Sequence, residues 1–238
     1  LINTEKIFMK SYMSVVANIL NKKKPETILD TPSGSGWLLS LLSYDPEIDG
    51  IDLFEEKPKG YRNFFKEDLD NGISDTLLKY DAIVSCEGIE HIGNPTLFLE
   101  TAKKHLNIGG TIIITTPNVW YPAAKIQYLL RGFFPSFPCL VGKINRGTHM
   151  HITPWSFAQL FLYLRLSGYT DIRLYDTSDK KPKHFFERIF GFPQKMYCRN
   201  KFKKAKSKEE KNFWKMSGSN QSIFGRRLVV SASSDSQA

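Results

Sequence analysis

Short apolar segments alternate with amphipathic ones along the first half of the chain. Five segments rich in aliphatic and β-branched residues predict strands: residues 26–30, 47–53, 61–69, 80–86 and 108–118. The last two are apolar on both faces, which is typical of parallel strands covered by helices. Helices are predicted at residues 3–20, from about Gly36, and at residues 94–106, where Asn94 is the expected cap. This repeated β-α-β order predicts an open, doubly wound α/β sheet.

The pattern changes after residue 118. Residues 119–152 combine a helix with an aromatic, proline-containing loop, and we expect this insertion to cover the substrate. "TPWSFAQLFLYLRLSGY" predicts a helix with Thr153 as its cap, followed by Gly168 at its end. "TDIRLYD" and "RRLVVSAS" predict two further strands, which complete a mostly parallel, seven-stranded sheet. We expect one domain over residues 1–238, with a basic insertion at residues 177–221 before the last strand.

The positive charge is concentrated in that basic insertion. The whole chain has a net charge of +9, and residues 177–221, with 13 Lys and Arg against 4 Asp and Glu, account for all of it. Phe, Tyr and Trp are interspersed among the lysines. Three interpretations remain open: helices packed on the sheet with solvated lysines, attachment to an anionic membrane surface, and nucleic-acid binding through phosphate contacts and base stacking.

Cysteine usage predicts a reducing compartment. Cys86, Cys139 and Cys198 are widely spaced, and the sequence contains no Cys-x-x-Cys, so neither a disulfide framework nor a cysteine zinc site is indicated. The N-terminal segment carries charges within an amphipathic pattern, and we expect no signal peptide there. We therefore expect a cytoplasmic protein, and the basic insertion leaves peripheral attachment to the inner face of the membrane open.

The stretch "ILDTPSGSGWLLSLL" (residues 28–42) has the form of a ligand-binding turn after a strand. A phosphate-binding P-loop requires a Gly-Lys pair, which this stretch lacks. A dinucleotide loop requires Gly-x-Gly-x-x-Gly. Gly34 and Gly36 supply two of these glycines, but Leu39 stands at the third position and disfavours an NAD-dependent enzyme. The remaining ligand class is S-adenosylmethionine (SAM).

"ILDTPSGSG" resembles the first motif of class I SAM-dependent methyltransferases, an acidic residue followed by Gly-x-Gly-x-Gly, with Pro32 at the first glycine. "YDAIVSCEGIEHIGNPTLFLETAKKHLNIGGTIIITTPN" resembles the fourth and fifth motifs of the type-11/12 branch. The resemblance covers about residues 25–118, and "THMHITPWSFAQLFLYLRLSGY" is a weaker match of a kind common in O-methyltransferases of quinone precursors and bacterial surface glycans. It implies a Rossmann-like methyltransferase fold and SAM as the cofactor.

The resemblance also implies which residues contact SAM. Asp52, at the end of the second strand, would accept hydrogen bonds from both ribose hydroxyls, because a carboxylate has two acceptor oxygens and no donor. Asp68, after the third strand, would contact the adenine amine. The implied cofactor contacts are Asp30, Ser33, Gly34, Ser35, Gly36, Asp52, Leu53, Asp68, Cys86 and Glu87.

Three histidines are candidate general bases. His91 follows the fourth strand at the carboxyl edge of the sheet, and His149 and His151 lie in the insertion expected to cover the acceptor. Each has a structural role as its alternative. We expect no metal, but Glu87, Glu90 and His91 have the i, i+3, i+4 spacing of one helical face. With His149 or His151 they would resemble the metal site of small-RNA 3′-terminal 2′-O-methyltransferases.

The sequence therefore predicts transfer of a methyl group from SAM to a hydroxyl of a small molecule, a glycan or a lipid-linked intermediate. Two alternatives remain open. One is a metal-assisted RNA 2′-O-methyltransferase. The other is a catalytically silent SAM-binding subunit, which Pro32 in the first motif would favour.

Overall fold

A computed structural model describes residues 10–135 and 151–234 of the chain. Its centre is a seven-stranded sheet in the order β3-β2-β1-β4-β5-β7-β6. The strands are β1 (Thr27–Asp30), β2 (Glu47–Asp52), β3 (Asn63–Lys66), β4 (Tyr80–Cys86), β5 (Leu106–Pro117), β6 (Thr170–Leu174) and β7 (Arg227–Ser233). β7 runs antiparallel to both of its neighbours, and the other pairs are parallel. The predicted α/β class and mostly parallel seven-stranded sheet are confirmed.

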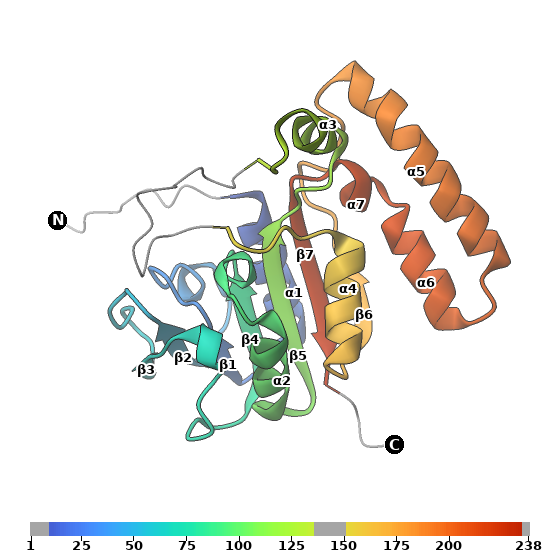
Figure 1. Cartoon of the computed structure of the whole chain (residues 1–238). Helices are drawn as coiled ribbons and strands as arrows, with labels where there is room; N and C mark the ends of the chain where they lie inside the picture. Colours follow the sequence, from blue (N-terminus) through green and yellow to red (C-terminus); the bar gives the residue numbers. More distant parts are fainter. Residues whose placement is uncertain (1–9, 136–150, 235–238) are drawn as a thin grey trace.

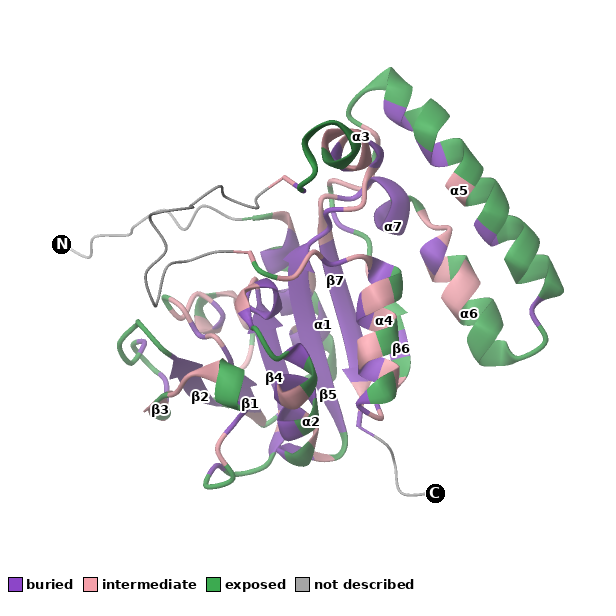
Figure 2. Ribbon diagram, in the orientation of Figure 1, coloured by how far each residue is buried: buried purple, intermediate pink, exposed green. Residues whose placement is uncertain are grey.

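Helices cover both faces of the sheet (Figure 1). α1 (Ser11–Lys23) covers one face, where its buried side chains pack against β1, β2, β4, β5 and β7. α2 (Pro95–Lys104) and α4 (Phe157–Leu166) cover the other face and contribute to a second apolar cluster. Figure 2 shows β4, β5 and β7 buried between these layers. Burial on two sides explains why β4 and β5 are apolar on both faces.

The helix expected from about Gly36 does not form. A turn and the short 3₁₀ helix η1 (Leu39–Leu41) connect β1 to β2 instead. The hydroxyl of Ser40 donates to the Trp37 carbonyl within this turn (2.6 Å). The crossover comprises residues 31–46: the glycine turn takes residues 31–36, and Pro46 at its end disfavours a helical conformation at Asp45. β3 and β4 are likewise joined through a 3₁₀ helix, η2 (Leu69–Asn71).

Of the other predicted helices, α2 begins as expected, with Asn94 as its N-cap. α4 begins later than predicted, because its cap is Ser156 rather than Thr153. The Ser156 hydroxyl accepts a hydrogen bond from the Gln159 N–H (3.1 Å), and these residues have the Ser-x-x-Gln spacing of a helix start. Trp155 is fully buried in the loop that precedes the helix.

Four further helices lie in or beside the two insertions. α3 (Pro122–Arg131) follows β5, and residues 177–221 contain α5 (Phe185–Lys204), α6 (Lys208–Ser217) and the first residues of α7 (Asn220–Phe224). α5 and α6 pack against each other as an antiparallel pair, and α6 contacts α4 (Figure 1). None of the described helices combines the length and the apolar character needed to cross a bilayer.

Candidate active site

The loop after β1 leaves its backbone open at one glycine. Gly34 has a φ of +50° and Gly36 a φ of +72°, values that glycine adopts without strain. A Cβ at Gly36 would lie 2.3 Å from the Cβ of Pro58, so close packing also requires glycine there. A Cβ at Gly34 would meet no heavy atom within 4 Å. A ligand could therefore approach the backbone at Gly34.

Asp52 lies at the end of β2 beside this loop. Its Oδ2 accepts a hydrogen bond from the Gly34 N–H (3.0 Å), and its Oδ1 accepts from the N–H groups of Phe54 (2.9 Å) and Glu55 (3.2 Å). These three donors fill three of the roughly four acceptor positions of a carboxylate, so Oδ2 keeps one position for a ligand. The carboxylate is thus oriented toward the glycine loop, and Oδ2 can accept a hydrogen bond from one sugar hydroxyl. The expected hydrogen bonds from both ribose hydroxyls would need two free acceptor positions, and one remains.

Asp30 and Pro32 join the loop to its surroundings. The Tyr61 hydroxyl donates a hydrogen bond to the buried Asp30 carboxyl. Burial raises the pKa of Asp30 to about 8, against the opposing effect of this hydrogen bond. Pro32 follows a cis peptide bond, and its Cδ would lie 2.2 Å from a Cβ at Gly88. The loops after β1 and β4 are therefore in direct contact at this proline.

The other predicted cofactor residues of the first three strands lie at the same edge. The Ser33 N–H donates to the Ile51 carbonyl (2.9 Å), which ties the glycine loop to β2. Ser35 separates the two glycines, and Leu53 is exposed directly after β2. Asp68 caps η2, after the end of β3. All of these residues lie along the carboxyl ends of β1, β2 and β3, beside the position of a nucleoside bound against Gly34.

Charged side chains line a hollow of about 460 Å³ beyond the carboxyl ends of β4 and β5. Its lining residues are Lys10, Glu87, Glu90, His91, Pro117, His151 and Arg227. Glu87 follows Cys86, whose thiol pKa is raised well above its usual value by burial. The Glu87 Oε2 pairs with the Arg227 Nε (2.8 Å), and the Thr116 hydroxyl donates to the Glu90 Oε2 (2.9 Å). Burial, together with the neighbouring charge of Glu87, raises the pKa of Glu90 to about 8.

Two of the three predicted histidines meet in this hollow. The rings of His91, in η3 (Ile89–His91), and His151 lie edge to face with centroids 4.9 Å apart. The backbone N–H groups of Ile152 and Thr153 donate to the Glu90 carbonyl (2.7 and 3.2 Å), which fixes the segment that carries His151. The structure therefore brings together two residues far apart in the sequence. His149 lies outside the described residues.

Part of the alternative metal set is also assembled. Candidate ligand atoms of Glu90, His91 and His151 all lie within 4.8 Å of one another. Glu87 does not belong to this group. Residues 87–91 do not form the expected helical face, because only residues 89–91 are helical, as a 3₁₀ turn, and Glu87 has a φ of +52° and pairs with the start of β7. The structure thus offers one carboxylate and two imidazoles for a cation.

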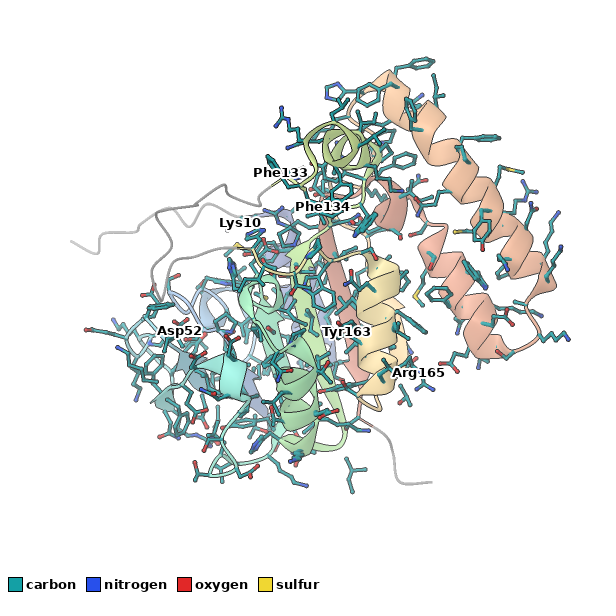
Figure 3. The ribbon with its side chains drawn as sticks, in the orientation of Figure 1. Lys10, Asp52, Phe133, Phe134, Tyr163 and Arg165 are labelled. Carbon is teal, nitrogen blue, oxygen red and sulfur yellow. The ribbon has the colours of Figure 1, made fainter. Side chains whose placement is uncertain are left out.

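Two charged lining residues, Lys10 and Arg227, were not predicted from the sequence. Arg227 opens β7, and the antiparallel register pairs it with Pro117 at the carboxyl end of β5. An antiparallel last strand would have predicted that the Arg-Arg pair before "LVVSAS" lies at this edge of the sheet. Lys10 directly precedes α1. Figure 3 shows Lys10 and Asp52 on the side of the sheet where the parallel strands end.

Comparisons with known proteins agree with this geometry. The chain matches a methyltransferase domain family over residues 5–173. Its fold resembles a SAM-dependent methyltransferase from Archaeoglobus fulgidus (15% identity, 93% of this chain and 94% of that chain, TM-score 0.53). It also resembles the methyltransferase domain of bacterial CtHen1 (16%, 94% and 97%, 0.51) and human N-acetylserotonin methyltransferase in complex with SAM (12%, 94% and 51%, 0.51). A search of the curated proteins gives no significant match.

The strand order, with an antiparallel β7 between β5 and β6, and the glycine loop beside Asp52 define a class I SAM-dependent methyltransferase. The chain belongs to the methyltransferase domain family, and its cofactor is SAM. At these low identities the structural likeness shows the fold, and the choice of acceptor has to be argued from the site itself.

Proposed function

We propose that this protein transfers the methyl group of SAM to a hydroxyl of a polar acceptor, such as a small metabolite, a glycan or a lipid-linked intermediate. The observation that carries the proposal is the hollow of about 460 Å³, in which two imidazoles, the Glu87–Arg227 ion pair and the buried carboxyl of Glu90 meet directly beyond Cys86. A hollow lined in this way suits an acceptor with several hydroxyls. The weaker similarity of residues 148–169 to O-methyltransferases of quinone precursors and bacterial surface glycans supports transfer to oxygen.

The residues at the ends of β1 to β3 would hold the cofactor. Asp52 would accept a hydrogen bond from a ribose hydroxyl on Oδ2, and the open backbone at Gly34 would lie against the amino-acid portion. Leu53 and Asp68 would contact the adenine, whose plane needs an apolar surface and whose amine needs an acceptor. When bound, SAM supplies the activated methyl group, and the protein contributes positioning worth about 7–11 kcal/mol.

His151 or His91 would take the proton of the acceptor hydroxyl as its oxygen attacks. A positioned base contributes about 10²–10⁴-fold in rate. Both imidazoles face the hollow beside Glu90, whose carboxyl is held by Thr116. Glu87, fixed by Arg227, would orient the acceptor by accepting a hydrogen bond from a neighbouring hydroxyl.

Incubation with radiolabelled SAM and fractionated lysate tests the proposal by asking which fraction takes up label: lipid, polysaccharide, RNA or small metabolites. With the acceptor in hand, His151→Ala should lower turnover by about 10²-fold or more while leaving the dissociation constant of SAM nearly unchanged. His184→Ala, which removes an exposed histidine outside the hollow, is the matched control. SAM binding without transfer to any fraction would favour the silent binding subunit instead.

A second candidate function, metal-assisted methyl transfer to RNA, is favoured by the cluster of Glu90, His91 and His151. A divalent cation there would bind a hydroxyl oxygen and lower its pKa. The two candidates differ in two measurements. The metal-assisted reaction requires label in RNA and loss of turnover on treatment with EDTA, with recovery on adding back a divalent cation. Activity that is insensitive to EDTA removes it.

A further inference from the structure

α5 uses only one narrow face to pack against the rest of the protein. Glu187, Gly191 and Cys198 are its buried residues. A Cβ at Gly191 would lie 2.4 Å from the Phe224 ring, so the helix approaches α7 closely there. Glu187 is fully buried and pairs with Arg226 (2.6 Å) at the start of β7. These contacts fix the rotation of α5 and therefore which of its residues face solvent.

The opposite side of α5, which we call the outward face, is apolar. It consists of Phe185, Ile189, Phe192 and Met196, which are between 36% and 76% exposed. Their i, i+4, i+7, i+11 spacing is the pattern by which an amphipathic helix normally buries one side. At 3.6 residues per turn these positions lie across the helix from Glu187, Gly191 and Cys198. Figure 2 shows the exposed length of this helix along the edge of the molecule.

Cations border the outward face along its length. Arg188, Lys195 and Arg199 follow one border with the same helical period, and all three are exposed. Within α5 the one acidic side chain is Glu187, which is buried and paired, so the exposed charges of this helix are all positive. A hollow of about 480 Å³ lies next to this border. It is lined by Lys181, Pro182, Arg188, Phe192, Lys195, Asn220 and Phe224.

α3 extends the apolar surface. α3 contacts α5, and its Leu129 and Leu130 are about four-fifths exposed (82% and 77%). Figure 1 shows α3 and the beginning of α5 on the side of the molecule toward which the carboxyl ends of β4 and β5 point. Figure 3 likewise places Phe133, directly after α3, on this side. The part of the apolar surface formed by α3 and the beginning of α5 therefore lies on the same side as the candidate active site.

We propose that the outward face of α5 docks on an anionic bilayer, with lipid phosphate groups bound in the hollow between Lys181, Arg188 and Lys195. Apolar side chains would enter the boundary between headgroups and acyl chains, and the flanking cations would contact the anionic headgroups. This arrangement of one apolar stripe with a cationic border is that of helices that lie in the membrane interface. The proposal concerns where the protein binds and does not depend on the identity of the methyl acceptor.

Other occupants fit the outward face less well. Pairing with a second copy of the chain would bring the border cations of both copies together, which costs binding energy. Single-stranded nucleic acid is bound by aromatic rings that stack on bases, whereas Ile189 and Met196, two of the four residues of the stripe, have no ring to stack. Both aromatic and aliphatic side chains occur on the apolar faces of interfacial helices, so the mixed composition of the stripe favours lipid.

The test is co-sedimentation of the full chain with vesicles of phosphatidylcholine alone and of phosphatidylcholine mixed with phosphatidylglycerol, across a salt series. We expect binding to the mixed vesicles only, weakened by salt. Arg188→Gln with Lys195→Gln should lower the partition coefficient about 25-fold, since each cation near an anionic surface contributes about fivefold. Ile189→Ser with Phe192→Ser should lower it by about tenfold or more.

Matched controls lie at the opposite edge of the sheet. Lys79→Gln with Lys104→Gln removes two exposed cations there, and Ile108→Ser removes an exposed apolar side chain that is 69% exposed near the start of β5. Because all the substituted residues are exposed, circular dichroism and thermal unfolding should match those of the wild type. Both control variants should bind vesicles as the wild type does.

Four results would overturn the proposal. The first is equal binding to neutral and anionic vesicles, and the second is an equal loss of binding in the control variants. The third is absence of vesicle binding, and salt-dependent binding of an RNA oligonucleotide would then assign the surface to nucleic acid. The fourth is a dimer in size-exclusion chromatography that Ile189→Ser with Phe192→Ser dissociates, because the outward face would then be an interface between copies.

Discussion

Asp52→Asn is the sharpest test of the cofactor site, because it changes one charge and almost no volume. An asparagine amide has one oxygen, which would stay where Oδ1 accepts from two backbone N–H groups. Its NH₂ group would then face the Gly34 N–H, which now donates to Oδ2 (3.0 Å). The same NH₂ group would occupy the position proposed for a ribose hydroxyl, so a donor would replace the acceptor at both contacts.

The expected size of the effect follows from these contacts. Loss of one charge-assisted hydrogen bond to the ligand costs about 1.5–3 kcal/mol, which raises the dissociation constant of SAM about ten- to 150-fold. Loss of the Gly34 hydrogen bond lowers the free energy of unfolding of the ligand-free protein by about 1 kcal/mol. The two effects are separable, because the first is measured on folded protein and the second on its unfolding.

Isothermal titration calorimetry with SAM measures the first quantity, and urea unfolding without SAM measures the second. Asp75→Asn makes the same change of charge at an exposed position and should leave both quantities unchanged. If Asp52→Asn binds SAM as tightly as the wild type, the carboxylate does not contact the cofactor and the assignment of the site is wrong.

Three further predictions concern stability. Burial raises the pKa of Asp30 from 3.8 to about 8, so between these pH values the folded state keeps a proton that the unfolded state has lost. The free energy of unfolding should therefore fall as the pH rises through this interval. Asp30→Asn should reduce this pH dependence in urea titrations at several pH values. Gly36→Ala should cost more than about 1 kcal/mol in urea unfolding, because its φ is +72° and the added Cβ would overlap Pro58, whereas unchanged stability would contradict the loop geometry. Arg226→Met should lower the free energy of unfolding by about 3–5 kcal/mol in chemical denaturation, because it leaves the buried Glu187 carboxylate unpaired. If loss of the ion pair is the cause, adding Glu187→Gln to the same chain should restore part of this free energy.

The sequence was informative where local signals set the structure. β4 and α2 are found as predicted, because an apolar run and an Asn94–Pro95 start each identify an element without reference to distant residues. The helix expected from about Gly36 does not form, and two local signals count against it: the glycine turn takes residues 31–36 of the crossover, and Pro46 disfavours a helical conformation at Asp45. The start of α4 could likewise have been read from the spacing of Ser156 and Gln159.

The acceptor side of the site could not be predicted in the same way. His91 and His151 were both named as candidates, but their contact depends on the hydrogen bonds that join Ile152 and Thr153 to the Glu90 carbonyl, which no sequence pattern indicates. Arg227 reaches the hollow because β7 is antiparallel, a pairing between strands far apart in the chain. Residues supplied by such long-range contacts need the fold before they can be placed.

Arg226 and Arg227 are adjacent in the chain, and they contact the proposed docking helix α5 and the acceptor hollow, respectively. The first pairs with Glu187 at the base of α5, and the second pairs with Glu87 in the acceptor hollow. Because consecutive residues entering a strand point to opposite sides, one backbone segment can hold the docking helix on one side and the hollow on the other. The Arg226 guanidinium also lies over the Tyr121 ring, 3.7 Å from its centroid, which adds the start of α3 to the same anchor. The orientation of the outward face relative to the acceptor hollow is therefore supported by this two-arginine segment together with the packing of α5 against α3, α6 and α7. A bilayer bound by α5 would then lie in a defined orientation relative to the hollow.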